Sequence, residues 1–122
     1  MPKPIYKAQP HDELYVEWTT VADGPCNILT RDDIDRPDFH LSRFTREEWH
    51  ERLDRADVNG TSEMWRPRPA WNAVHTVQHI YGDNSQYGRI RHCDLLDYAL
   101  LCFCGAHEEA WDLFCTSIDE VT

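Results

Sequence analysis

The run of apolar residues from Leu95 to Phe103 constrains the fold of this chain more than any other feature. At helical spacing its apolar side chains surround the axis almost completely, and a helix that is apolar on all sides is buried. Asp94 stands at the expected start of this helix and Gly105 at its expected end. The rest of the chain must therefore supply elements that cover this helix from several directions.

The last part of the chain predicts a second helix. Five apolar residues after Gly105 fall on one stripe at helical spacing: Ala110, Trp111, Phe114, Cys115 and Ile118. A short connection between two helices favours an antiparallel pair. We therefore expect a C-terminal helical hairpin that packs on a sheet.

An N-terminal β-hairpin is predicted for residues 14–30. Every second residue of the first strand is suited to one apolar face: Leu14, Val16, Trp18 and Thr20. The sequence Asp23-Gly24-Pro25 is typical of a turn, because Gly reaches positive φ and Pro cannot continue a strand ladder. Residues 26–30 then form the returning strand. Residues 1–12 carry three prolines and no period, which indicates an extended arm.

A capping box gives the clearest helix signal in the chain, after a polar loop at residues 31–44. The hydroxyl of Thr45 can accept from a first-turn amide while the side chain of Glu48 reaches back to the amide of Thr45. Apolar residues follow at helical spacing: Trp49, Leu53 and Ala56. Asn59-Gly60 supplies a left-handed end. The predicted helix covers residues 46–57.

Residues 69–82 are compatible with both a helix and a strand, and we favour a strand for residues 74–81, paired with residues 88–92. The chain is then a single α+β domain over residues 1–122, with residues 1–12 as its arm. Its small antiparallel sheet consists of the N-terminal hairpin plus a third and fourth strand. The sheet packs against the helix of the N-terminal half and the C-terminal helical hairpin.

The distribution of charge points away from nucleic acid and membrane. The formal net charge is −10, and from Cys93 to Thr122 there are seven carboxylates and no Lys or Arg. Such a field repels phosphate backbones and anionic lipid, and it suits a protein partner with a basic surface. No run of about 18 apolar residues occurs, so no membrane span is expected. The N-terminus lacks the apolar stretch of a secretory signal. The five cysteines are an odd number, which does not suit a framework of disulfides. We therefore expect a cytoplasmic protein with reduced thiols.

Three residues suggest a metal- or thiol-dependent enzyme as the alternative function. His75 and His79 share one face, and Cys93 precedes a predicted helix, where the dipole lowers a thiol pKa. Two histidines do not complete a zinc site, which needs three or four protein ligands, and His92 and His107 are the further candidates. Because no complete motif is present, we expect no cofactor and prefer a chain without catalytic machinery.

The segment Trp65-Arg66-Pro67-Arg68-Pro69-Ala70-Trp71 is the strongest functional signal. Alternate prolines hold the backbone extended, and Trp and Arg dominate the hot spots of interfaces. The alternative is a rigid connector whose tryptophans cover the edge of the core. We predict a small acidic protein-binding module, regulatory or inhibitory, with these partner-binding residues: Trp65, Arg66, Arg68 and Trp71.

Overall fold

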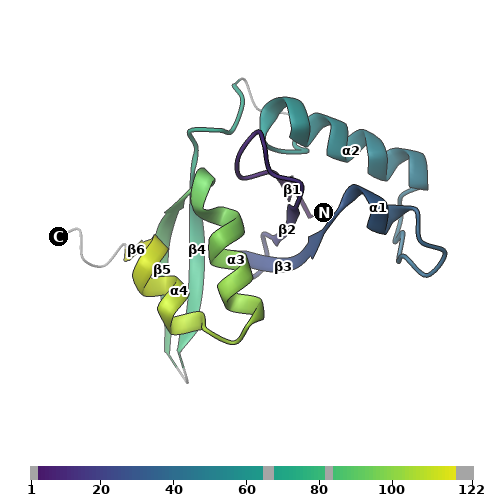
Figure 1. Ribbon diagram of the computed structural model, residues 1–122. Helices are drawn as coiled ribbons and strands as arrows, with labels where there is room; N and C mark the ends of the chain where they lie inside the picture. The colour runs from purple at the N-terminus through teal and green to yellow at the C-terminus, as the bar shows by residue number, and fades with distance from the viewer. Residues whose placement is uncertain (1–2, 65–67, 82–83, 118–122) are drawn as a thin grey trace.

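The chain folds into two three-stranded antiparallel sheets with helices packed beside them (Figure 1). In this computed structural model, residues 3–64, 68–81 and 84–117 are described. The first sheet has the order β1-β2-β3 and the second the order β4-β5-β6. The prediction of an α+β fold is confirmed, but the strands divide into two sheets instead of one.

The predicted N-terminal hairpin is present as β2 (Tyr15–Thr19) and β3 (Gly24–Leu29). The predicted arm contributes a short strand of its own, β1 (Ile5–Tyr6), which pairs with β2 and is fully buried. The arm is therefore part of the first sheet. A strand of two residues carries too little periodicity to be recognised in a sequence.

Both faces of the first sheet are buried, whereas the alternation predicted one apolar face. Tyr15 and Leu29 are paired and belong to one apolar cluster, with residues of helix α2 (Arg46–Asn59). Val16 and Ile28 are the next pair and belong to a second cluster, with residues of helix α3 (Leu95–Phe103) and the second sheet. Neighbouring residues of a strand point to opposite faces, so the sheet separates two cores.

Two capping boxes begin the helices of the N-terminal half. The predicted helix is α2 (Arg46–Asn59), with Thr45 and Glu48 in the expected capping box and Gly60 at φ 79° after its end. The predicted loop before it contains a short helix, α1 (Arg31–Ile34), capped by Thr30 and Asp33 in the same way. A helix of one turn has no apolar stripe, so its sequence signal is only the cap.

The preference for strands in residues 74–81 is confirmed. β4 (Val74–Tyr81) and β5 (Asn84–Arg91) form a long hairpin, and β6 (Cys115–Ser117) pairs with β5 on the far side. A 3₁₀ turn (His92–Asp94) then leads from β5 into α3.

The C-terminal helices are α3 (Leu95–Phe103) and α4 (His107–Phe114). The first has the predicted bounds, although the carboxylate of Asp94 accepts from Arg91 Nε at 3.0 Å and makes no side-chain cap. The second is shorter than predicted, because Cys115 begins β6 and pairs with Ile90; Ile118 lies outside the described residues. Strand pairing with β5 therefore replaces the last helical turn. No helix in the described ranges is long and apolar enough to cross a membrane.

Candidate functional site

The predicted connector contributes one exposed cation and one partly buried indole. Arg68 is exposed. Trp71 is half-buried, and its ring meets the ring of His92 edge-on with centroids 6.0 Å apart. Trp65 and Arg66 lie outside the described residues. The packing of Trp71 on a buried side chain favours the connector role for this residue, and the partner-binding role of the segment stays a prediction.

His75 and His79 share one face of β4, as expected for a strand, but they lie about 13 Å apart along it. Two nitrogen ligands of one zinc ion lie within about 4 Å of each other. The ring of His79 stacks on Trp111 with centroids 5.0 Å apart, far from the partner of His75. These two histidines therefore cannot hold the same ion.

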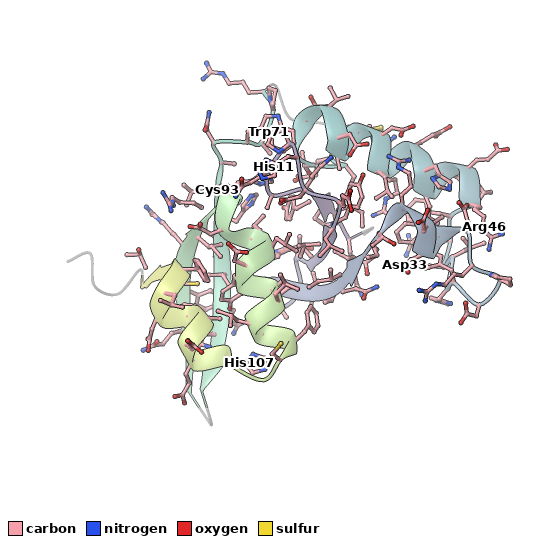
Figure 2. All side chains as sticks on the ribbon, in the orientation of Figure 1. His11, Asp33, Arg46, Trp71, Cys93 and His107 are labelled. Carbon is pink, nitrogen blue, oxygen red and sulfur yellow. The ribbon has the colours of Figure 1, made fainter. Side chains whose placement is uncertain are left out.

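The remaining candidates do not complete a centre either. The thiol of Cys93 is half-buried and lies 3.8 Å from Asp94 Oδ1. Cys93 and His107 lie at opposite ends of α3 (Figure 2). In residues 3–64, 68–81 and 84–117, no group of three His, Cys, Asp or Glu side chains is placed to hold a metal ion.

The structure instead joins His75 to His92 in a buried pair. His75 Nε2 lies 2.8 Å from His92 Nδ1, and His92 Nε2 lies 2.6 Å from the carbonyl oxygen of Lys7. A carbonyl oxygen only accepts, so His92 Nε2 carries a hydrogen and, in the neutral pair, His92 Nδ1 accepts from His75. The rings of Tyr6 and Trp18 pack against His75. The pair links the second sheet to the N-terminal arm.

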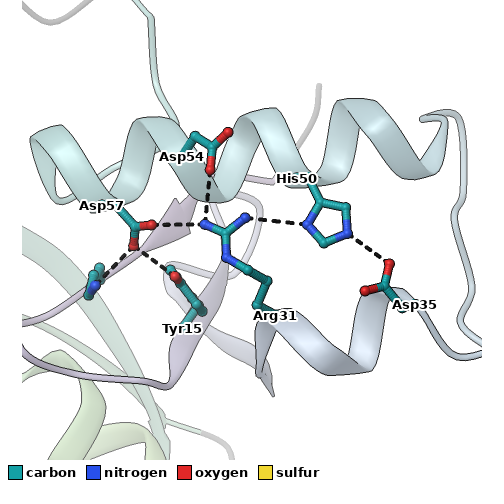
Figure 3. A network of polar contacts seen from close by, with 7 residues as sticks. Tyr15, Arg31, Asp35, His50, Asp54 and Asp57 are labelled. Atoms are coloured by element: carbon teal, nitrogen blue, oxygen red, sulfur yellow. Dashed lines mark hydrogen bonds and ion pairs between the residues drawn. The ribbon is translucent and has the colours of Figure 1, made fainter.

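A chain of ion pairs lies on the other side of the first sheet, between β2, α1 and α2 (Figure 3). Asp57 accepts from the hydroxyl of Tyr15 at 2.7 Å, from Lys7 Nζ at 2.9 Å and from Arg31 Nη2 at 2.8 Å. Burial raises the pKa of Asp57, but the hydrogen bonds from Tyr15 and Lys7 outweigh burial and hold that pKa below its ordinary value. Asp57 is therefore an ionised anchor for three segments.

The chain of contacts continues from Arg31 toward solvent. Arg31 Nη2 lies 3.0 Å from Asp54, and Arg31 Nη1 lies 3.3 Å from His50 Nδ1. His50 Nε2 lies 2.8 Å from Asp35. Since arginine only donates, His50 Nδ1 accepts and Nε2 donates to the carboxylate. Each of these groups makes a hydrogen bond or an ion pair with another residue of the chain, so the network holds α1 against α2.

The outer surface of α3 and α4 combines exposed carboxylates with exposed apolar side chains. Its acidic members are Asp97, Glu108, Glu109 and Asp112, and its large apolar members are Leu100, Phe103 and Leu113. In the described part of the chain these four carboxylates make no ion pair within 4.0 Å. We call this set the helical-hairpin face.

A pocket of about 580 Å³ lies beside α2, against the edge of the first sheet and the loop before α2. Its lining includes the aromatic rings of Phe39, Phe44 and Trp49 together with the buried guanidinium of Arg52. Sequence reasoning missed this site, because Arg52 stands in a polar helix sequence beside Leu53. The available signal was the presence of two phenylalanines, Phe39 and Phe44, in a segment that is mostly polar.

Comparisons with protein-family models, with curated proteins and with solved structures found no match to this chain.

Proposed function

We propose that this protein is a protein-binding module, regulatory or inhibitory, that presents its helical-hairpin face to a partner with a basic surface. The observation that carries the proposal is the composition of this face. Phe103 is 53% exposed and Leu113 is 62% exposed, and both belong to a segment, residues 93–122, that has seven carboxylates and no Lys or Arg. Two cations of β5 line a pocket together with Leu113 and Asp112, namely Arg89 and Arg91. Apolar side chains exposed among polar ones are typical of interaction sites.

The charges of the face define the chemistry of the partner. Four carboxylates without ion pairs in the described part of the chain favour a negative potential over the two helices, least at Asp112, which lines a pocket together with Arg89 and Arg91. A complementary surface rich in Lys and Arg would be attracted over a distance set by the ionic strength. The apolar side chains would then provide the contact area of the complex. A membrane or a phosphate backbone is disfavoured by the same charges.

The test compares surface variants in affinity capture from extracts of the source organism. The wild-type chain and the double variant Leu100→Ser/Phe103→Ser are compared with the control Val21→Ser/Val58→Ser, which changes two exposed side chains elsewhere. The proposal expects a basic protein that the wild type and the control retain and that Leu100→Ser/Phe103→Ser loses. Binding of this purified partner should weaken about tenfold in Glu109→Lys and should weaken as salt is added.

The connector supplies the competing surface in the same experiment. The captured protein could be lost in Trp65→Ala and Arg68→Ala but fully retained in Leu100→Ser/Phe103→Ser. This outcome would show that the connector binds the partner and that the helical-hairpin face does not. Equal capture by all variants would reject both surfaces.

The enzymatic alternative has less support. A centre built from His75, His79 and Cys93 would need these side chains at one place, but His75 lies against His92 and His79 lies against Trp111. Metal analysis of the purified chain tests this alternative directly. A stoichiometric metal that is lost in His75→Ala would revive it.

A further inference from the structure

The guanidinium of Arg52 is a buried cation without a carboxylate partner. Arg52 is 4% exposed, and no carboxylate of the described residues lies within 4.0 Å of it. Burying a charge without an opposite charge is costly. Burial lowers the pKa of Arg52, with a further lowering by Arg55 and an opposing influence of Glu17. The fold therefore maintains a buried cation that makes no direct ion pair in the described residues, with Glu17 acting on it only from a distance.

Two aromatic rings and one carbonyl oxygen hold this guanidinium in position. Its central carbon lies 4.4 Å from the ring centroid of Phe44 and 4.5 Å from that of Trp49. The two rings are themselves in edge contact, so they form a corner around the cation. Arg52 Nη2 donates to the carbonyl oxygen of Lys3. The indole of Trp49 is fixed in turn, because its Nε1 donates to the carbonyl of Leu41 at 2.8 Å.

The other N–H groups of Arg52 face the pocket. A guanidinium has five N–H donors, and Arg52 makes one hydrogen bond, from Nη2, within the described residues. No fully enclosed side-chain nitrogen or oxygen in the described residues lacks a hydrogen-bond partner. Nε and Nη1 of Arg52, which make no hydrogen bond in the described residues, are therefore not fully enclosed, and the space that Arg52 lines is the pocket beside α2.

The other charges of the pocket select a ligand with a single negative charge. Lys3 and Arg43 line it as cations without an ion pair in the described residues, while Arg36 is already paired with Asp33 at 3.1 Å. Two further carboxylates line the pocket: that of Glu17 accepts from the thiol of Cys26 at 3.6 Å, and that of Asp38 has no ion pair in the described residues. A polyanion such as phosphate would be repelled by Glu17 and Asp38, whereas one carboxylate is balanced by the cations.

We propose that this pocket binds a small aromatic monocarboxylate, with the carboxylate on the free N–H groups of Arg52 and the aromatic body against Phe39 and Phe44. Two parallel N–H groups of a guanidinium match the two oxygens of a carboxylate. Most of the lining residues are polar or charged, and the rings of Phe39, Phe44 and Trp49 supply the apolar surface on which an aromatic body can pack. The proposal concerns a different surface from the helical-hairpin face, so either can fail without the other.

The probe for the test is benzoate, observed by NMR through the indole N–H signal of Trp49, which is assigned with the variant Trp49→Phe. Benzoate should shift this signal with a dissociation constant on the order of 1 mM. Benzamide has the same shape without the charge, and inorganic phosphate has charge without the ring, so neither should shift the signal at the same concentration. A response to benzamide equal to that to benzoate would overturn the proposal, as would no response to benzoate at about 20 mM.

Variants locate the binding within the pocket. Arg52→Gln should weaken benzoate about tenfold or more, since it removes the charged donor pair. Because Arg52 is buried and this variant can lose its fold, Glu17→Gln provides a second test: removal of the repelling charge should tighten benzoate about threefold. Arg89→Gln is the control, because Arg89 is exposed on β5 of the second sheet and does not line the pocket. Unchanged affinity in Glu17→Gln, or weaker affinity in Arg89→Gln than in Arg43→Gln, would contradict the proposed site.

Discussion

The indole of Trp111 lies directly over the backbone of Gly88. A Cβ atom at Gly88 would be 2.6 Å from Cη2 of Trp111 and 2.8 Å from the carbonyl oxygen of Thr116. Trp111 is the residue of α4 that also stacks on His79, so this contact fixes the distance between the helix and the second sheet. The absence of a side chain at residue 88 is therefore a packing requirement of the fold.

Gly88→Ala should destabilise the protein by about 1–3 kcal/mol, because the added methyl group must displace either the indole or the paired strand β6. Chemical denaturation measures the effect. Gly24→Ala is the matched control, since Gly24 also lies in a strand and its nearest neighbour would be 3.8 Å away. Its free energy of unfolding should stay within about 0.5 kcal/mol of that of the wild type. Equal losses in both variants would show that the contact with Trp111 is unimportant.

Alanine variants of two glycines with positive φ should distinguish the cost of backbone strain from the cost of a steric clash. Gly60 has φ 79° and Gly105 has φ 87°, and both follow the ends of helices. Gly105→Ala should cost about 1 kcal/mol from strain alone, because nothing lies within 4 Å of its added Cβ. Gly60→Ala should cost at least about 1 kcal/mol more, because its Cβ would be 3.0 Å from both the His92 and Trp71 rings. Thermal unfolding that gives the same loss for both would refute the close packing at Gly60.

Asp57 should make stability depend on acid pH. The pKa of its carboxyl is below the ordinary value of 3.8 in the folded chain, so the ionised form favours folding. This contribution is complete above the unfolded pKa and disappears as the pH falls through the folded pKa. Asp57→Asn should therefore lower the free energy of unfolding by about 1–2 kcal/mol at neutral pH. The difference from the wild type should shrink below a pH of about 4.

The control for this series is Asp38→Asn, because Asp38 is exposed and forms no hydrogen bond or ion pair in the described part of the chain. It should follow the wild type at every pH. A constant difference between Asp57→Asn and the wild type over the whole range would mean that the ionisation of Asp57 is not coupled to folding.

The thiols should react with a disulfide reagent at different rates, because they differ in solvent exposure and in pKa. Burial raises the pKa of Cys115 to about 12, and burial with the nearby Glu17 raises the pKa of Cys26 to about 11. The thiolate is the reactive form, so both should react slowly with an aromatic disulfide reagent at mildly alkaline pH. Cys104 is exposed and should give the fastest phase. Cys104→Ser should remove this phase, whereas Cys26→Ser and Cys115→Ser should leave it intact. A fast phase that survives Cys104→Ser would contradict the assignment.

The helices and strands that were predicted correctly are specified by residues within or next to each element. The capping box at Thr45 and the apolar run from Leu95 to Phe103 each specify a helix without reference to the rest of the chain. The missed elements depend on distant partners. β1 is a strand because Ile5 pairs with Glu17 and Tyr6 pairs with Val16. Helix α4 ends before Cys115 because Cys115 pairs with Ile90 of β5.

The residues of the candidate sites were harder to predict for the same reason. His92 was considered only as an additional ligand, yet it is fully buried and is bonded to His75 and to the arm. Arg52 lies against Trp49 of the same helix and against Phe44 of the preceding loop, and helical periodicity gives no information about the loop residue. The indole of Trp71, a predicted partner-binding residue, is half-buried because it packs against the ring of His92.

The bond from His92 to the carbonyl of Lys7 spans 85 residues, so it also bears on how the protein is made. Translation runs from the N-terminal side, so the arm is synthesised 85 residues before the imidazole that secures it. The first strand can pair with β2 before His92 exists, but its attachment to the second sheet has to wait until residue 92 has left the ribosome.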